Sequence, residues 1–193
     1  MKSNDFLQLF EKPVSAMEAQ AVLRDLGLHD AWYARKMAID TYGFAVPCKE
    51  AVEALVALSP LIEVGTGNGY YSRLLGASGA DIVATDVGKQ GGYSKMWKTE
   101  GVLQAEAVEA VKAYPDRNVF MSWPSYDESW AGQVAKAMAK GRVLAYIGEG
   151  RGGCTADDGF FDILDSDFEE IGGVAIPKWE GIHDYLKLYK KKV

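Results

Sequence analysis

The segment that most constrains the fold is Leu61–Tyr71, where an apolar run leads into a glycine-rich turn. Its letters, LIEVGTGNGYY, predict a buried strand over Leu61–Val64 and a helix that begins at Tyr70. Glycine carries no Cβ and adopts positive φ at little cost, so a backbone of this kind can approach a ligand closely. The first N–H groups of the helix have no partner within the helix and can face the same ligand.

A second apolar run, Asp81–Asp86, follows the helix and ends in an acid. The two runs and the helix between them predict a strand–helix–strand unit with a nucleotide-type pocket at the carboxyl edge of the sheet. An acid at the end of the second strand can accept hydrogen bonds from ribose hydroxyls. The glycines occupy the first, third and fifth places of the turn, whereas a dinucleotide fingerprint needs the first, third and sixth. This spacing argues against an NAD oxidoreductase.

Glu63 two residues before the first glycine, the Gly-x-Gly-x-Gly turn and Asp86 one strand later resemble class I S-adenosylmethionine-dependent methyltransferases, in a branch without an assigned substrate. The resemblance covers most of the chain from Phe44 to Tyr189. It implies that S-adenosyl-L-methionine lies on the glycine turn and that the second acid holds its ribose. The cofactor-binding residues implied in this way are Glu63, Gly65, Thr66, Gly67, Asn68, Gly69, Asp86, Gln104, Ala105 and Trp123.

The same resemblance implies an α/β three-layer sandwich with a mostly parallel seven-stranded sheet, order 3-2-1-4-5-7-6, whose last strand is antiparallel. We expect one domain over residues 1–193, with a helical N-terminal cover over 1–43 and the Rossmann-like core over 44–193. Ser15 and Glu18 predict a capping box at the start of one cover helix. Apolar runs predict seven strands: Leu61–Val64, Asp81–Thr85, Val102–Gln104, Val119–Ser122, Arg142–Ile147, Phe168–Ile176 and Ile182–Tyr189. Pro177–Gly181 is the expected hairpin turn between the last two strands.

Helical periodicity predicts further helices between these strands, over Lys49–Leu58, Tyr70–Ser78, Ala105–Tyr114, Ser129–Lys140 and Asp157–Leu164. The glycine-rich segment 87–101 is long for a loop in a compact domain, and such loops are usually functional or mobile. We therefore expect it to be a lid near the cofactor edge.

The net charge of −6 argues against loose binding to nucleic acid or to an anionic membrane. No apolar run approaches the length of a membrane span, and the N-terminus lacks the pattern of a signal peptide. Cys48 and Cys154 are too few for a disulfide framework, and no paired Cys/His spacing predicts a metal site. We expect a cytoplasmic protein with a small-molecule partner, while the oligomeric state stays open.

The loop after the fourth strand, Trp123–Tyr126, resembles the Asn/Asp-Pro-Pro-Tyr motif of amino-methylating members of the family. In that branch the first side chain takes up the hydrogens of the amine, and the aromatic residue stacks on the substrate. Here Trp123 replaces Asn/Asp and Ser125 replaces the second Pro, so the acceptor-binding group is missing. Trp123 and Tyr126 either form an aromatic wall, which attracts a cation through its ring faces, or pack at the end of a strand.

The candidate catalytic residues are His183, Glu149 and Tyr126. His183 follows the predicted hairpin turn, and histidine titrates near neutrality and often acts as a general base. Glu149 closes the fifth strand at the same edge and can act as a base or hold a cationic substrate. Each has a structural alternative. The neighbouring acids Asp157 and Asp158 equally suit the amino end of a helix.

The leading hypothesis is an S-adenosylmethionine-dependent methyltransferase that acts on a small-molecule acceptor. Two alternatives keep the cofactor and drop the transfer: a sensor or interaction module, and an enzyme that cleaves the sulfonium with Glu149 or His183. The methyltransferase predicts that S-adenosylhomocysteine forms in the presence of an acceptor, which would count against the sensor. The sulfonium-cleaving enzyme predicts cofactor turnover without an acceptor.

Overall fold

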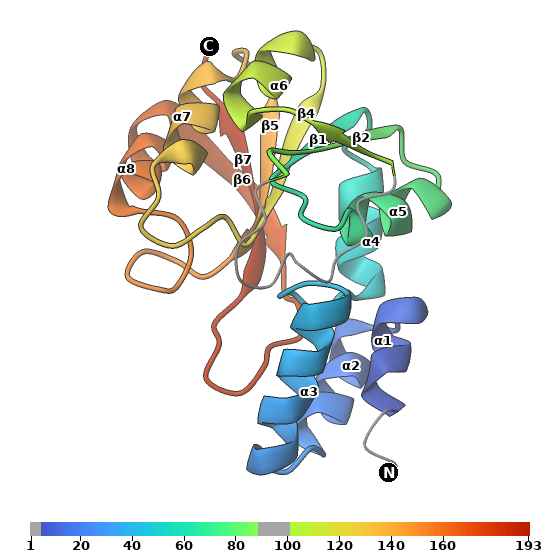
Figure 1. The fold of residues 1–193 in the computed structure, drawn as a ribbon. Coiled ribbons are helices and arrows are strands. Elements are labelled where there is room, and N and C mark those ends of the chain that lie inside the picture. Colours follow the sequence, from blue (N-terminus) through green and yellow to red (C-terminus); the bar gives the residue numbers. More distant parts are fainter. Residues whose placement is uncertain (1–4, 89–100) are drawn as a thin grey trace.

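A seven-stranded sheet in the order β3-β2-β1-β4-β5-β7-β6 forms the centre of the computed structural model, which describes residues 5–88 and 101–193 (Figure 1). Strand β7 is antiparallel to both of its neighbours, β5 and β6, whereas the pairs among β1 to β5 are parallel. The predicted order and the antiparallel last strand are therefore confirmed. The strands are β1 (Leu61–Val64), β2 (Ile82–Asp86), β3 (Val102–Gln104), β4 (Asn118–Ser122), β5 (Val143–Gly148), β6 (Phe168–Val174) and β7 (Tyr185–Lys191).

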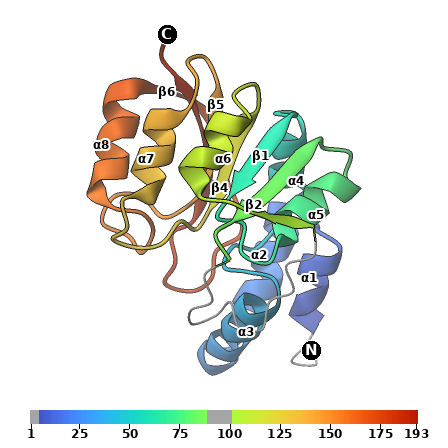
Figure 2. The same cartoon turned by 45° about the horizontal axis from the view of Figure 1, so that its top comes forward.

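Helices cover both faces of the sheet and complete the predicted three layers (Figure 2). Successive strand residues point to opposite faces of the sheet, so one strand contributes side chains to two hydrophobic clusters. Leu61 and Phe120 pack with α4 (Lys49–Val56) and α5 (Tyr70–Ala77). Ile62 and Met121 pack on the other face, against α6 (Ala107–Ala113), α7 (Trp130–Ala137) and α8 (Asp158–Asp167).

The N-terminal segment is helical, as predicted, and consists of the 3-10 helix η1 (Asp5–Leu7), α1 (Gln8–Glu11), α2 (Ala16–Arg24) and α3 (Leu28–Thr41). The predicted capping box is present, because the Ser15 hydroxyl accepts the Glu18 N–H and the Glu18 carboxylate accepts the Ser15 N–H. Phe6 and Phe10 belong to the same hydrophobic cluster as Leu61. The helices lie beyond the carboxyl ends of the parallel strands (Figure 1), and the chain leaving α3 enters that edge.

The connection between the last two strands differs from the predicted hairpin. β6 ends at Val174 and β7 begins at Tyr185, so the turn predicted at Pro177–Gly181 is part of a ten-residue connection over 175–184. The Lys178 backbone exchanges two hydrogen bonds with the Gln20 side chain on α2, at 3.1 and 2.8 Å. Trp179 is buried, and its indole N–H donates to the Phe44 carbonyl. The connection leaves the sheet because it packs against the N-terminal helices.

Several predicted helix ends move by a few residues. α8 begins at Asp158 and continues to Asp167, and Asp157 is its N-cap, whose carboxylate accepts the Phe160 N–H at 2.9 Å. α6 begins at Ala107 instead of Ala105. Most of the predicted lid over 87–101 lies outside the described residues. Within the described residues, no helix combines the length and the apolar character that a membrane span requires.

Candidate functional site

The glycine turn joins β1 to α5 with three left-handed residues. Gly65, Gly67 and Gly69 have φ values of 66°, 60° and 72°. At Gly65 a Cβ would lie only 2.8 Å from the Trp130 ring, and at Gly69 it would lie 2.8 Å from a Val102 methyl. Side chains are excluded at both positions by backbone conformation and by contact, which explains the glycines of this turn.

Asp86 at the end of β2 is tied to the glycine turn. One of its carboxylate oxygens accepts the Gly67 N–H at 2.9 Å, and the other accepts the Gly88 N–H at 2.9 Å. A carboxylate has about four acceptor sites, so each oxygen keeps capacity for a further donor. The acid is thus held rigidly beside the turn with acceptor capacity to spare.

Asn68 fixes the other side of the turn. Its side-chain oxygen accepts the Tyr70 N–H, and its amide group donates to the Thr41 carbonyl at the end of α3, both at 2.9 Å. The N-terminal cover is therefore bound directly to the glycine turn.

Glu63 lies fully within the sheet, one residue before the end of β1, with 2% of its surface exposed. Burial raises the pKa of this carboxyl from its ordinary 4.5 to about 7, although hydrogen bonds from Ser72 and Thr66 oppose the rise. The Ser72 hydroxyl on α5 donates to it. Glu63 thus connects strand and helix below the turn and titrates near neutrality.

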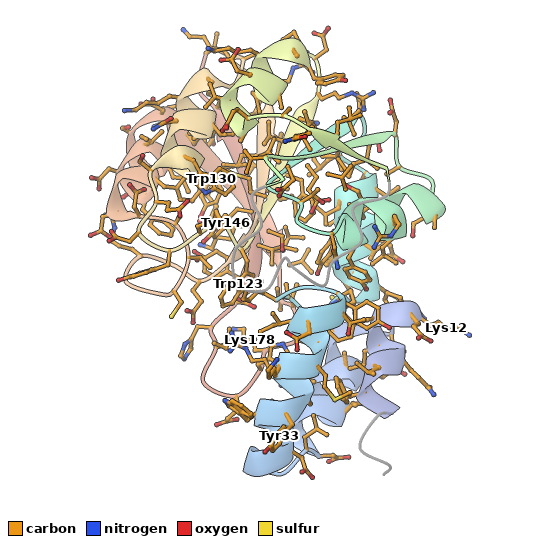
Figure 3. All side chains as sticks on the ribbon, viewed as in Figure 1. Lys12, Tyr33, Trp123, Trp130, Tyr146 and Lys178 are labelled. Atoms are coloured by element: carbon orange, nitrogen blue, oxygen red, sulfur yellow. The ribbon has the colours of Figure 1, made fainter. Side chains whose placement is uncertain are left out.

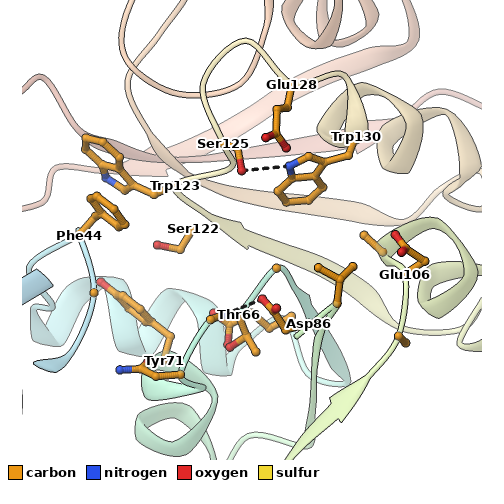
Figure 4. A pocket seen from close by; sticks show the side chains of 18 of the residues that line it. Phe44, Thr66, Tyr71, Asp86, Glu106, Ser122, Trp123, Ser125, Glu128 and Trp130 are labelled. Carbon is orange, nitrogen blue, oxygen red and sulfur yellow. Dashed lines mark hydrogen bonds between the residues drawn. The ribbon is translucent and has the colours of Figure 1, made fainter. Parts of the chain in front are cut away.

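The turn, Asp86 and the loop after β4 surround one cavity of about 860 Å³, within the range of about 300 to 1,000 Å³ typical of small-molecule sites (Figure 4). The cavity lies at the carboxyl ends of β1, β2 and β4. β2 and β4 lie on opposite sides of β1: the chain runs outward from β1 to β2 and β3 and then returns to β4 on the other side of β1. The strand order therefore reverses here, and this is the switch point where ligands bind in open α/β sheets.

Eight of the ten predicted cofactor-binding residues line this cavity: Glu63, Gly65, Thr66, Gly67, Asn68, Asp86, Ala105 and Trp123. The other two, Gly69 and Gln104, are not among its lining residues. Gly69 is the N-cap of α5 behind the turn, and the Gln104 amide donates to the Val87 carbonyl at 3.3 Å. A role of these two residues in cofactor binding stays a prediction.

Trp123 occupies an unusual position at the end of β4, between the sheet and α3 (Figure 3). Its φ is 53°, a strained value for a bulky residue. The indole N–H donates to an Asp184 oxygen at 3.0 Å, and the ring stacks on Phe44 with centroids 4.9 Å apart and planes 12° apart. Both rings line the cavity and form an aromatic wall. The predicted pair of Trp123 and Tyr126 is not present, because Tyr126 is not among the lining residues.

The three candidate catalytic residues lie outside the cavity lining. Tyr126 is 67% exposed, and the His183 side chain is 82% exposed. The Glu149 carboxylate is buried but accepts the backbone N–H groups of Cys154 and His183, at 2.9 and 2.8 Å. Burial acts to raise the pKa of this carboxyl, but the hydrogen bonds from Cys154 and His183 together outweigh it and lower the pKa. The fold brings Glu149 and His183 together, with His183 Nδ1 3.4 Å from Glu149 Oε1, and their catalytic roles stay a prediction.

Sequence reasoning missed Asp184, which is wholly buried beside Trp123. One of its oxygens accepts the indole N–H, and the other has no hydrogen-bond partner. Burial raises the pKa of this carboxyl from 3.8 to about 7, with the Trp123 hydrogen bond opposing the rise. The side chains of Tyr71, Glu128 and Trp130 also line the cavity without having been predicted. No spacing in the sequence distinguishes them from packing or surface residues.

No family model and no curated protein matches this chain. Among solved structures, magnesium protoporphyrin IX methyltransferase from Synechocystis, with bound SAM, is 12% identical at a TM-score of 0.49, over 74% of this chain and 79% of that one. N-methyltransferase NodS from Bradyrhizobium japonicum, in complex with S-adenosyl-L-homocysteine, is 14% identical at 0.44, over 74% and 86%. TrmN from Thermus thermophilus is 15% identical at 0.48, over 74% and 47%.

These TM-scores are all below 0.5, and it is the strand order of this chain itself that defines its fold. That order is the one which the resemblance to class I S-adenosylmethionine-dependent methyltransferases predicted.

Proposed function

We propose that the chain is an S-adenosylmethionine-dependent methyltransferase with a small-molecule acceptor. The observation that carries the proposal is the joint position of the glycine turn and the Asp86 carboxylate on one cavity at the switch point of the sheet. The order of motifs along the sequence predicts that the glycine turn and Asp86 lie side by side, and in the fold both line the same cavity.

The residues present fit the cofactor. Asp86 keeps acceptor capacity on both oxygens, which suits the two hydroxyls of a ribose. At Gly65 the Trp130 ring lies 2.8 Å from where a Cβ would be, so only glycine lets the turn pass this close beneath it. Ala105 and Glu106, after β3, line the side where the resemblance places the adenine.

The bound cofactor would supply a methyl group already activated on sulfur, so the chain needs to hold an acceptor in line with that methyl and to exclude water. The aromatic rings and the small polar groups at the end of β4 are placed for both tasks. The cavity volume indicates a small acceptor. Cys48 and Cys154 are both free thiols, which is consistent with a cytoplasmic location as part of this proposal.

Binding without transfer is the second candidate, favoured by the occupied Trp123 indole N–H. Trp123 replaces the amide or acid of the amino-methylating motif, and its only polar group is bound to Asp184. Incubation of the protein and S-adenosylmethionine with a small-molecule extract distinguishes the methyltransferase from the binding protein. S-adenosylhomocysteine forms if the chain transfers methyl groups. Turnover of the cofactor without any acceptor would instead identify a sulfonium-cleaving enzyme.

Calorimetric titration with S-adenosylhomocysteine tests the cofactor assignment. We expect binding to the wild-type chain and a loss of about 10- to 100-fold for Asp86→Ala, since two charge-assisted hydrogen bonds disappear. Asp116→Ala is the matched control, because this acid is 91% exposed in its side chain and lies outside the cavity lining. Equal affinities of Asp86→Ala and the wild type would refute the assignment.

A further inference from the structure

The cavity has two chemically different ends (Figure 4). Thr66, Asp86 and Glu106 mark the end assigned to the cofactor. Phe44, Ser122 and Trp123 gather at the other end, where the chain leaving α3 meets the loop after β4. This second end is the place left for the acceptor, so its chemistry bears on the acceptor class.

The acceptor end has a flat apolar wall. Phe44 and Trp123 stack face to face, so the wall is a two-ring stack that can present a flat outer ring face and ring edges to the cavity. The wall is fixed at one side by the hydrogen bond from the Trp123 indole to buried Asp184, and at the other by the bond from Trp179 to the Phe44 carbonyl. A flat ring packs against such a surface with little loss of contact area.

The charged residues among the described lining residues are all acidic: Glu63, Asp86, Glu106, Glu109 and Glu128. Carboxylates in a partly enclosed cavity disfavour an anionic nucleophile such as a thiolate or phenolate, and they favour a positive charge. Aromatic ring faces favour a positive charge as well. Outside the lining, the Arg35 guanidinium already lies over the Trp123 ring, 5.7 Å from its centroid.

We propose that the acceptor is a small planar amine, bound against the Phe44–Trp123 wall, with Asp184 as the residue that positions Trp123. This inference rests on the proposed function. An amine attacks as a neutral nucleophile and becomes positive as it gains the methyl group. The positive charge that starts on sulfur therefore moves within the cavity to nitrogen and stays among the carboxylates.

The transfer balances without a further reactant. The nitrogen lone pair forms the new N–C bond while the S–C bond breaks, and the bonding electron pair remains on sulfur as a neutral thioether. Where the nitrogen carried hydrogen, the methylated ammonium then loses one proton to water. No base is required at the moment of attack, which agrees with the position of His183 and Glu149 outside the cavity lining.

Two flat ions of opposite charge test the inference, N-methylpyridinium as a mimic of the methylated product and benzoate. Each is titrated into the protein saturated with S-adenosylhomocysteine. We expect N-methylpyridinium to bind at least about 10-fold more tightly than benzoate, because a cation–π contact and the carboxylates favour one sign. Equal affinities, tighter binding of benzoate, or no binding of the cation would overturn the inference.

Variants assign the effect to the wall. Trp123→Ala should weaken N-methylpyridinium about 3- to 30-fold, and Trp123→Phe should restore part of that loss. Circular dichroism shows whether both variants are folded, and N-methylpyridinium is titrated into each at saturating S-adenosylhomocysteine. Trp32→Ala is the control, because Trp32 is 63% exposed and lies outside the cavity lining.

Asp184→Ala tests the positioning role. It should weaken N-methylpyridinium while Asp184→Asn, which keeps an acceptor for the indole N–H, retains most of the affinity. Equal effects of the two substitutions would reject that role. If S-adenosylhomocysteine itself does not bind, the proposed function fails. If it binds and the cation does not, only the acceptor class fails.

Discussion

Replacing Glu63 by Gln should change how the stability of the protein depends on pH. In the folded chain this buried carboxyl has its pKa raised from 4.5 to about 7, whereas the unfolded chain exposes it to water. Between these two values the folded state holds a proton that the unfolded state has released. Stability from this group is therefore complete below pH 4.5 and is lost as the pH rises through about 7.

The size of the effect follows from the two pKa values. A rise from 4.5 to about 7 makes the wild type lose about 2 to 3 kcal/mol of unfolding free energy between roughly pH 5 and roughly pH 8, relative to Glu63→Gln. Asp184 titrates in the same range in both proteins, so its contribution cancels in the difference.

Urea unfolding of both proteins across this pH range provides the measurement, with the unfolding free energy extrapolated to water. The part of the difference in unfolding free energy that does not vary with pH, whatever its sign, reflects packing and hydrogen bonding of the amide. Only the part that varies with pH reflects the binding of a proton by Glu63. A difference that stays the same from acid to alkaline pH would refute the conclusion that burial controls this carboxyl.

Three further substitutions test other parts of the structure. Gly65→Ala should lower the affinity for S-adenosylhomocysteine by about 10-fold or more in calorimetry, since the new methyl meets Trp130 at 2.8 Å. The control is Gly141→Ala, at φ 79° with open space around it, which should share only the backbone strain of about 1 to 2 kcal/mol. Equal losses of affinity in the two variants would contradict the contact argument. Asp157→Ala should cost about 1 kcal/mol in urea unfolding because α8 loses its N-cap, and Asp158→Ala should cost less; the reverse order would be inconsistent with the cap. Asp184→Asn should flatten the pH dependence of stability as Glu63→Gln does, because its pKa is also raised to about 7, and an unchanged pH profile would show that the group ionises normally.

The sheet, and the meeting of the glycine turn with Asp86 at one cavity, could be predicted because local patterns determine them. An apolar run, glycines that need positive φ and an acid at the next strand end each have few structural solutions, and all of them agree. Tyr42 and Phe44, where the N-terminal cover meets the core, also line the cavity.

The catalytic candidates could not be predicted in the same way, because strand ends locate a residue but not the direction of its side chain. Glu149 lies at the predicted edge, yet its oxygens accept two backbone N–H groups from loops distant in sequence. Tyr126 follows a strained Trp123 and points to solvent. The partner of Trp123, Asp184, comes from a connection whose path depends on Gln20 of α2, which is a contact between opposite ends of the chain.

A crystal structure of the protein with S-adenosylhomocysteine tests the central claim most directly. We predict the ribose hydroxyls on the Asp86 carboxylate, the sulfur beside Gly65 and Gly67, and open space from the sulfur toward the Phe44–Trp123 wall. A ligand bound elsewhere, or an Asp86 carboxylate without contact to the sugar, would contradict the assignment of this cavity.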